Sequence, residues 1–333
     1  MRRPEPEKRR VRVRHEAWPL ARPFAISRGV KTQADVVVVE ITDGRLAGRG
    51  ECVPYPRYGE TVAGVIEDIE KVEAALAAGI ERDQLRNVLA AGAARNAVDA
   101  ALWDLEAKTQ GRRAWQIAGL DQPGPCLTAE TIGIGTIDEM AASARRLAGA
   151  PLIKVKLDDR QVIERMQAVR DQAPTARLII DPNEGWSLAL LRDVAPLLCE
   201  LGVEMIEQPL SATDDAGLAA YDCPLVLCAD EACHTKEGLD QLQGKYQMIN
   251  IKLDKTGGLT EALELAAAAR ELDFQIMVGC MVGTSLAMAP AALLGCFARF
   301  VDLDGPLLLK QDRQPGLRFD GGYVHPPAPE LWG

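Results

Sequence analysis

The stretch LIKVKLD at residues 152–158 decides the fold, because the chain repeats its pattern of a short apolar run followed by charge. Eight such runs alternate with stretches rich in Ala and Leu, and six of the seven intervals are plainly helical. Near-continuous apolar strands separated by helices indicate a parallel sheet that is covered on its outer face. The eight runs are LTAETIGIG (127–135), LIKVKLD (152–158), RLIIDPNEG (177–185), VEMIEQPL (203–210), LVLCADE (225–231), MINIKLDK (248–255), QIMVGCM (275–281) and RFVDLDGP (299–306).

This repeat sets the domain organisation. Eight strand–helix units in about 180 residues predict an α/β fold, a modified (β/α)₈ barrel of the TIM type, over residues 113–306. Residues 1–112 then form a separate α+β domain, and the Gly- and Pro-rich segment 307–333 is expected to fold back onto it. The one remaining interval, residues 211–224 between the fourth and fifth runs, predicts only a short helix.

The first domain has both strand and helix patterns. Residues 11–18 and 35–41 alternate as strands do, and DGRLAGRG at residues 43–50 predicts a turn between β segments. Residues 60–110 carry Ala, Leu and charged residues at helical spacing. We therefore expect a small sheet followed by helices.

Composition and charge exclude several classes of protein. Lys and Arg number 38 and Asp and Glu 48, so the 333-residue chain has a net charge of −10 at pH 7. A binder of the phosphate backbone needs a basic face, and no nucleic-acid partner is expected. A content of 47% hydrophobic and 26% charged residues is that of a soluble globular protein.

Neither the amino terminus nor the interior predicts export or a membrane partner. MRRPEPEKRR (1–10) has no apolar stretch behind it, so we expect no secretory signal, a cytoplasmic location and reduced cysteines. The uncharged residues between Asp273 and Arg299 include Gly, Pro and polar residues, which indicates a buried strand, a polar loop and a buried helix. The spacing of Cys228 and Cys233 does not match a zinc motif.

Three carboxylates follow three consecutive strands, at the end of the barrel where active sites lie. Asp181, Glu207 and Asp230 are 26 and 23 residues apart, one strand–helix unit each, so adjacent strands about 4.8 Å apart present them together. A divalent cation offsets their repulsion, and a set of oxygen ligands selects Mg²⁺, or Mn²⁺, over Zn²⁺. Any one of them alone could simply cap the next helix, but three in succession favour a single metal site.

Lysines at the ends of the second and sixth strands indicate proton transfer. Lys154 and Lys156 are two residues apart and share one strand face, whereas Lys252 follows the strand opposite in a ring of eight. A substrate on the metal would have a lysine on each side, which is what racemisation or epimerisation requires. Lys154 and the metal should lower the pKa of Lys156. The alternative is a pair of surface lysines bound to Asp158 or Asp254.

Two further acids follow the eighth strand, across the ring from the metal. Asp302 and Asp304 alternate onto one face, and no third carboxylate on a neighbouring strand suggests a second metal. They are suited to a cation on the substrate, such as an α-ammonium group, although structural capping is the alternative. A substrate with an ammonium at one end and a carboxylate at the other fits a dipeptide. Mg²⁺ on that carboxylate would stabilise the enolate formed when the neighbouring proton leaves.

These residues lie within motifs that carry a family resemblance. From about Val11 to Leu317 the chain resembles the muconate-lactonizing subgroup of the enolase superfamily and, within it, the L-Ala-D/L-Glu epimerases. KVKLD (154–158) together with NIKLDKTGG (250–258) and DLDGP (302–306) is a specific combination, whereas K-x-K alone would be weak. The other matching stretches are AWPL (17–20), ISRG (26–29), ADVVVVEI (34–41), GECVPYPRYGE (50–60), AGAARNAVDAALWDLEAK (91–108), EQPL (207–210) and CADEACHT (228–235).

The resemblance implies a Mg²⁺-dependent dipeptide epimerase that interconverts L-Ala-D-Glu and L-Ala-L-Glu through a metal-stabilised enolate, in the recycling of murein peptides. The roles that it implies are those of bases for Lys156 and Lys252, of metal ligands for Asp181, Glu207 and Asp230, and of substrate contacts for Lys154, Asp302, Asp304, Thr131 and Cys280. It also implies that the first domain caps the barrel mouth. There FAISRGVK (24–31) supplies Arg28 and Lys31 for a glutamate side chain, and PYPRYGE (54–60) is a second capping loop.

Other functions use the same features in part. One alternative is a dipeptide epimerase of different side-chain specificity, and another is an o-succinylbenzoate synthase or cycloisomerase, which shares metal and lysines but has no use for two acids on strand 8. A Schiff-base aldolase barrel would need a lysine nucleophile but no carboxylate trio. A non-catalytic protein that kept the scaffold is the last alternative. The basic extension has no role in the family pattern, and a homo-oligomer is compatible with the sequence.

Overall fold

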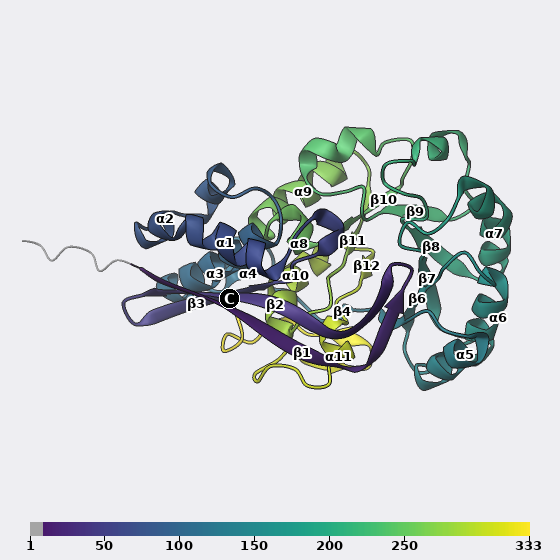
Figure 1. Ribbon diagram of the computed structural model, residues 1–333, viewed down its shortest axis with the longest axis horizontal. Coiled ribbons are helices and arrows are strands. Elements are labelled where there is room, and N and C mark those ends of the chain that lie inside the picture. Colours follow the sequence, from purple (N-terminus) through teal and green to yellow (C-terminus); the bar gives the residue numbers. More distant parts are fainter. Residues whose placement is uncertain (1–8) are drawn as a thin grey trace, which may run out of the picture.

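The amino-terminal part of the chain is an antiparallel sheet whose first two strands form one long hairpin (Figure 1). In this computed structural model, which describes residues 9–333, β1 (Arg10–Ile26), β2 (Gly29–Asp43) and β3 (Leu46–Cys52) lie in that order in the sheet. The two strands that the sequence predicted are present but longer, because β1 and β2 continue to a tip at residues 27–28. The predicted turn after β2 is shorter than expected, since β3 begins at Leu46.

Helices follow the sheet, as the helical spacing of residues 60–110 predicted. Their bounds are η1 (Pro56–Tyr58), α1 (Val62–Lys71), α2 (Glu73–Ala77), η2 (Arg82–Asn87), α3 (Ala93–Gln110) and α4 (Ala114–Ile117), where η marks a 3₁₀ helix. Helix α3 packs so closely on β3 that glycine is required there. A Cβ atom on Gly48 would lie 2.1 Å from the carbonyl oxygen of Ala101, and one on Gly50 would lie 2.1 Å from that of Ala97.

Eight parallel strands form the second sheet, in which their order follows the chain. They are β5 (Glu130–Ile132), β6 (Leu152–Lys156), β7 (Arg177–Asp181), β8 (Val203–Glu207), β9 (Val226–Ala229), β10 (Met248–Ile251), β11 (Gln275–Val278) and β12 (Phe300–Val301). A parallel bridge joins Thr128 to Val301, and the amide of Ala129 donates to the Val301 carbonyl at 2.8 Å, which links the two ends of the sheet. The predicted TIM-type α/β fold is confirmed.

Helices occupy most intervals between these strands. They are α5 (Ile137–Arg146), α6 (Val162–Gln172), α7 (Leu188–Glu200), η3 (Ala216–Ala220), η4 (Lys236–Gln241), α8 (Leu253–Thr256), α9 (Leu259–Glu271), α10 (Ser285–Ala292) and η5 (Leu293–Phe297). The expectation of an ordinary helix between β9 and β10 was wrong, because only η4 forms there. The interval begins with a turn closed by the bond from the Cys233 amide to the Asp230 carbonyl, and Gly244, shortly after η4, has a φ of 76°, which no α-helix accommodates.

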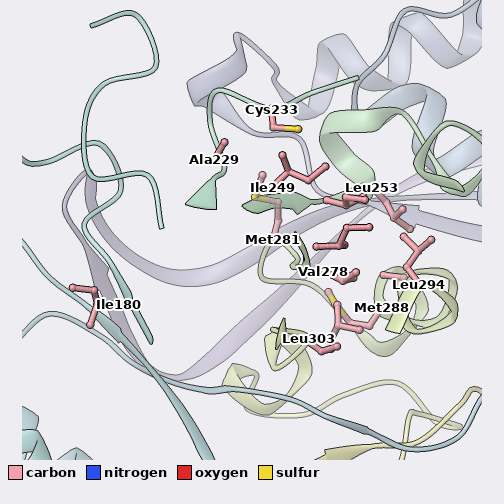
Figure 2. Packing of buried hydrophobic residues seen from close by; sticks show 14 of the residues in the cluster. Ile180, Ala229, Cys233, Ile249, Leu253, Val278, Met281, Met288, Leu294 and Leu303 are labelled. Carbon is pink, nitrogen blue, oxygen red and sulfur yellow. The ribbon is translucent and has the colours of Figure 1, made fainter. Parts of the chain in front are cut away.

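The pleat of the strands divides side chains between two cores. One residue of each strand or its flanking segment fills the barrel interior, and this set is Ala129, Leu152, Ile179, Met205, Cys228, Met248, Met277 and Phe300. The alternate residues face outward: Ile249 and Val278, both labelled in Figure 2, belong to the same outer cluster as Met288 of α10 and Leu294 of η5. Because successive side chains of a strand point to opposite faces, the residue two places after each interior residue also faces inward, at the mouth of the barrel.

The last part of the chain forms a small third sheet and then lies against helix α3. After α11 (Gly305–Leu308), strands β13 (Phe319–Asp320) and β14 (Tyr323–Val324) pair with β4 (Cys126–Leu127). The indole of Trp332 donates to the Ala100 carbonyl at 2.9 Å, and the Gly333 amide donates to Asp104 at 2.8 Å, so the tail lies against α3.

Residues 273–299 form a strand, a loop and a buried helix, as the sequence predicted. Within the described residues, no helix combines the length and the apolar character that a bilayer crossing would demand. The first eight residues of the basic extension lie outside the described residues.

The contact between β3 and α3 yields a stability prediction. Gly50→Ala should lower the free energy of unfolding by about 3 kcal/mol, because the new methyl group would meet a helix carbonyl that cannot rotate away. Thermal unfolding followed by circular dichroism measures this change. Gly124→Ala is the matched control, since a Cβ there meets no atom within 4 Å. Equal melting temperatures for the two variants would contradict the close packing.

Candidate active site

The mouth of the barrel gathers the residues that the sequence singled out. One pocket there is lined by side chains from the barrel strands, from the loops after them and from the β1–β2 hairpin. Its lining includes Arg28, Lys31, Thr131, Lys154, Lys156, Asp230, Lys252, Cys280, Asp302 and Asp304. Asp181 and Glu207, the remaining two, are fully buried and contact lysines of this pocket. The barrel strands and the loops after them bring ten of the twelve predicted residues to one place, and the β1–β2 hairpin adds Arg28 and Lys31.

The three strand-end carboxylates form a compact group. One oxygen from each of Asp181, Glu207 and Asp230 lies within 4.8 Å of the others. Neighbouring polar groups hold them in place: Asn183 donates its side-chain amide to Asp181 at 3.1 Å, and Asn250 donates to Glu207 at 2.8 Å. None of the three caps the helix that follows its strand, so their grouping is not a by-product of helix capping.

Two lysines flank this group, one on the strand before the three carboxylate strands in the sheet and one after the strand that follows them. Lys156, on β6, bonds to Asp181 at one end of the trio, and Lys252, after β10, lies 2.5 Å from Asp230 at the other. The alternative of surface lysines is wrong, since both are at most 8% exposed and neither pairs with Asp158 or Asp254.

Lys154 lies deeper in the barrel than the other two lysines. Its amine is 2.6 Å from Glu207, 2.7 Å from Asp302 and 3.3 Å from Asp181. Burial alone would lower the pKa of Lys154, but these carboxylates hold it well above its usual value. Lys154 is therefore a fixed positive charge beneath the pocket and connects the trio to the acids on the opposite wall.

Charge pairing also decides the protonation of the trio. Burial opposes the ionised form of Asp181, but Lys156 and Lys154 bring its pKa down to about 2. Burial likewise disfavours the charged Asp230, and Lys252 holds its pKa well below the usual range. The same pair raises the pKa of Lys252 well above its usual value. Asp181 and Asp230 are therefore charged and available as ligands at neutral pH.

The donor set fits a hard divalent cation. Three carboxylates supply oxygen only, and their ligand atoms are close enough to share one ion. Two of these carboxylates, Asp181 and Asp230, already form ion pairs with Lys156 and Lys252. Cation binding and lysine pairing therefore draw on the same negative charge, and Asp181, Glu207 and Asp230 are the residues that would hold the metal.

A second acidic pair lines the opposite wall. Asp302 receives a bond from Lys154 through Oδ2, but its Oδ1 is buried without a hydrogen-bond partner among residues 9–333. Asp304 accepts the backbone amide of Thr131 at 2.7 Å. Burial and the neighbouring Asp302 raise the pKa of Asp304 to about 7. An entering ammonium group would find an unpaired oxygen and a surplus of negative charge here.

The hairpin tip supplies two cations that differ in their partners. Arg28 lies 2.7 Å from Glu231, and it also bonds to the hydroxyl of Tyr55 and the carbonyl of Asn183. Lys31 lies 4.7 Å from the centre of the Tyr55 ring and forms no ion pair with any carboxylate of the described chain. Burial lowers the pKa of Lys31, so this amine is the cation with unused capacity for a carboxylate.

Two family models together cover nearly the whole chain. Residues 8–119 match the mandelate racemase/muconate lactonizing enzyme amino-terminal domain, and residues 138–330 match the enolase carboxy-terminal domain-like model.

The chain belongs to the mandelate racemase/muconate lactonizing enzyme family of the enolase superfamily.

Individual members of this family are similar over almost their full length. The L-Ala-D/L-Glu epimerase of Escherichia coli K12 is 50% identical over 319 residues, which are 95% of this chain and 99% of that protein. The N-acetyl-D-glutamate racemase of a Pseudoalteromonas species is 44% identical over 90% of this chain and 95% of its own length. An enolase family member from Agrobacterium tumefaciens with homology to dipeptide epimerases, solved with sodium and L-Ala-L-Glu, superposes with a TM-score of 0.96 at 52% identity, covering 98% of this chain and all of that one.

This member of the family has site residues that sequence reasoning missed. Glu231 follows Asp230 and is 4% exposed at the pocket wall, where it meets Arg28. Lys255 donates to Asp230 at 2.7 Å and to the Asn250 carbonyl at 3.0 Å. A charge next to a strand-end motif was visible for both, but their partners come from other strands or from the hairpin.

A further missed contact joins the second capping loop to the barrel. Arg57 bonds to both carboxylate oxygens of Glu184, at 2.7 and 2.8 Å, and Glu184 also lies 3.3 Å from Arg28. The segment containing Arg57 was expected to cap the mouth, but nothing in its spacing named Glu184 as the partner. Tyr55 and Tyr58 of the same loop line the pocket.

Metal binding should depend on the buried trio and not on nearby acids. Asp230→Asn is expected to weaken Mg²⁺ binding by about 100-fold or more, because it removes one of three charged ligands. Isothermal titration with MgCl₂ measures the affinity. Asp159→Asn, an exposed acid after the same barrel end of β6, should bind as the unaltered protein does. Equal affinity for both variants would place the metal elsewhere.

Proposed function

We propose that this protein is a Mg²⁺-dependent dipeptide epimerase, an isomerase that interconverts L-Ala-D-Glu and L-Ala-L-Glu. The observation that carries the proposal is the pair Lys156 and Lys252 on either side of a buried carboxylate trio. The names of the similar proteins, an epimerase and a racemase of glutamate compounds, support the same class of reaction. A cytoplasmic role in recycling murein peptides, which contain the L-Ala-D-Glu unit, belongs to the same proposal.

The two lysines divide the proton transfer. One removes the α-proton of the carboxy-terminal residue, and the other donates a proton to the opposite face, so the configuration at that carbon is inverted. When bound to the trio, Mg²⁺ supplies positive charge beside the substrate carboxylate, which favours the electron-rich transition state. Lys154 adds a permanent positive charge below the same carboxylate. The surrounding barrel excludes water and keeps both amines in place.

The ends of the pocket match the ends of a dipeptide. Asp302 and Asp304 would hold the α-ammonium group, since Asp302 has an unpaired buried oxygen and Asp304 gains from a neighbouring cation. Thr131 orients Asp304 through its backbone amide, and Cys280 lines the same wall. The distance between this wall and the trio is bridged by Lys154, which contacts both.

Lys31 is the proposed contact for the glutamate side chain. Arg28 is already committed to Glu231 and the backbone, so it would support the hairpin tip more than it would bind the substrate. A substrate carboxylate beside Lys31 would favour the charged amine and remove the cost of burying it alone. Specificity for an acidic side chain then depends on one cation.

A racemase of N-acylated glutamate is the second candidate, because one similar protein bears that name. Such a substrate would share the carboxylates and the α-proton but would carry no ammonium group. The unpaired oxygen of Asp302 favours the dipeptide, since an acyl group would leave that buried Oδ1 without a hydrogen-bond donor. A comparison of kcat/KM for L-Ala-D-Glu and N-acetyl-D-glutamate decides between them.

Proton NMR in D₂O tests the reaction directly. With Mg²⁺ and L-Ala-D-Glu, the signal of the glutamate α-proton should disappear while the L,L isomer accumulates, because each turnover returns a solvent deuteron. EDTA should stop both changes. Absence of exchange at saturating Mg²⁺ would reject the proposed function, and exchange that persists in EDTA would favour lysine chemistry without a metal.

Lys31→Met should change specificity more than catalysis. The value of kcat/KM for L-Ala-L-Glu is expected to fall by about 10- to 100-fold, the loss of one charge-assisted contact, while that for L-Ala-L-Met should not fall. Steady-state kinetics with both dipeptides measure the change. Lys31→Arg keeps the charge and should retain the preference for glutamate. An equal loss for both substrates in Lys31→Met would show that this residue does not select the side chain.

A further inference from the structure

The segment that begins at Lys252 is held by the amino-terminal domain as well as by the barrel. Lys252 precedes α8, and the amides of Lys255 and Thr256 donate to the Lys252 carbonyl at 2.9 and 3.1 Å. The base therefore stands at the start of a single helical turn. Any shift of that turn would move the backbone from which the Lys252 side chain projects.

Asp254 anchors this turn to the first domain. Its Oδ1 accepts the side-chain amide of Asn96, on α3, at 2.8 Å and the backbone amide of Val53, after β3, at 3.0 Å. All three groups are buried, so the bonds form away from water, where a lost partner is costly. No part of the proposed proton transfer uses Asp254, although it lies two residues from the base.

The far end of the turn is fixed by the same helix. Arg95 donates to the carbonyls of Thr256, at 2.7 Å, and Gly257, at 3.2 Å. A Cβ on Gly258 would lie 2.4 Å from an oxygen of Asp99, so the helix and the turn are in direct contact. Arg95, Asn96 and Asp99 of α3 thus contact the segment that follows Lys252 from Asp254 to Gly258.

The anchor at Val53 also leads to the specificity loop. Val53 is two residues before Tyr55, whose ring lies beneath Lys31 and whose hydroxyl bonds to Arg28. One carboxylate therefore connects the catalytic turn to the part of the cap that faces the substrate side chain. Within residues 9–333, the segment that carries Lys156 makes no comparable side-chain bond to the cap: Lys156 bonds to Asp181 of β7, and Asp158, two residues later, bonds to Arg165 of α6.

We propose that Asp254 is a positioning residue that acts through Lys252 alone: bound to Asn96 and Val53, it fixes one of the two bases relative to the cap. The inference rests on the proposed two-lysine reaction. Its consequence is one-sided, because loosening the turn should slow proton exchange on the face served by Lys252 and spare the face served by Lys156. A loss of overall stability would slow both faces together.

Isotope exchange of the two isomers separates these outcomes. L-Ala-D-Glu and L-Ala-L-Glu are incubated separately in D₂O with Mg²⁺, and the initial rate of α-deuteration is measured for each by NMR. Lys252→Ala defines the reference pattern: one isomer should stop exchanging, while the other still exchanges through Lys156 without inversion. Asn96→Ala and Asp254→Ala should shift the ratio of the two rates in the same direction, by about tenfold or more.

Two control variants preserve the two hydrogen bonds of the anchor. Asp254→Asn retains an Oδ1 acceptor for both donors and should restore the unaltered ratio. Trp103→Phe removes another hydrogen bond between α3 and the barrel, from the indole to Thr260 at 3.0 Å, away from the turn. It should leave the ratio unchanged even if it lowers the melting temperature. If Asp254→Ala does not fold, Asn96→Ala carries the test, since it leaves the bond from Val53 intact.

The inference fails if Asn96→Ala slows both isomers equally or leaves their ratio unchanged. It also fails if Trp103→Phe shifts the ratio as strongly, because the effect would then belong to the domain contact in general. The proposed function fails separately, when the unaltered protein exchanges neither isomer or when Lys252→Ala abolishes exchange of both.

Discussion

Mutual neutralisation of buried charge is the constraint on which this site depends. Carboxylates from four strand ends and lysines from two meet where water is nearly excluded, and an unpaired member would be strongly destabilising. Each lysine therefore serves two purposes, since it balances a carboxylate and faces the pocket. The pairing would also couple a bound cation to the lysines, because Asp181 and Asp230 belong to the trio that could hold a metal and also pair with Lys156 and Lys252. The ion pairs that offset the cost of burying these charges therefore also determine the charge state of the groups that we propose to react.

The strand pleat explains why so much of the site was predictable. On β8, Met205 fills the barrel interior and Glu207, two residues later, faces the mouth. Ile179 and Asp181 have the same relation on the neighbouring strand β7. An apolar run that ends in a charged residue therefore indicates both the end of the barrel at which that residue lies and the face of the strand to which its side chain points. The family motifs then added the hairpin cations, whose placement no periodicity indicates.

Contacts between distant segments were not predictable from local patterns. Asp254 was considered only as a partner for a surface lysine, because its true partners, Asn96 and the Val53 amide, lie about 160 and 200 residues away in the chain. Glu231 was likewise not assigned a role, because it directly follows the predicted metal ligand Asp230 and its partner Arg28 lies on the distant hairpin. The 3₁₀ turn η4 was mistaken for a regular helix, since local spacing does not reveal how much of an interval a turn consumes. Docking of the two domains, rather than local propensity, decides the partners of Asp254 and Glu231.

The β1–β2 hairpin has an irregularity with a consequence for how specificity changes over evolution. Its register is continuous from Arg10 to Pro19 and resumes at Phe24, so the intervening residues of β1 bulge where the hairpin leaves its own sheet and reaches the barrel. Leu20 within this bulge bridges to Leu309 near the end of the chain. Insertions or substitutions in the bulge would shift the hairpin tip without changing the residues that we propose for proton transfer. New substrate preferences are thus accessible to mutations that never touch the ligand.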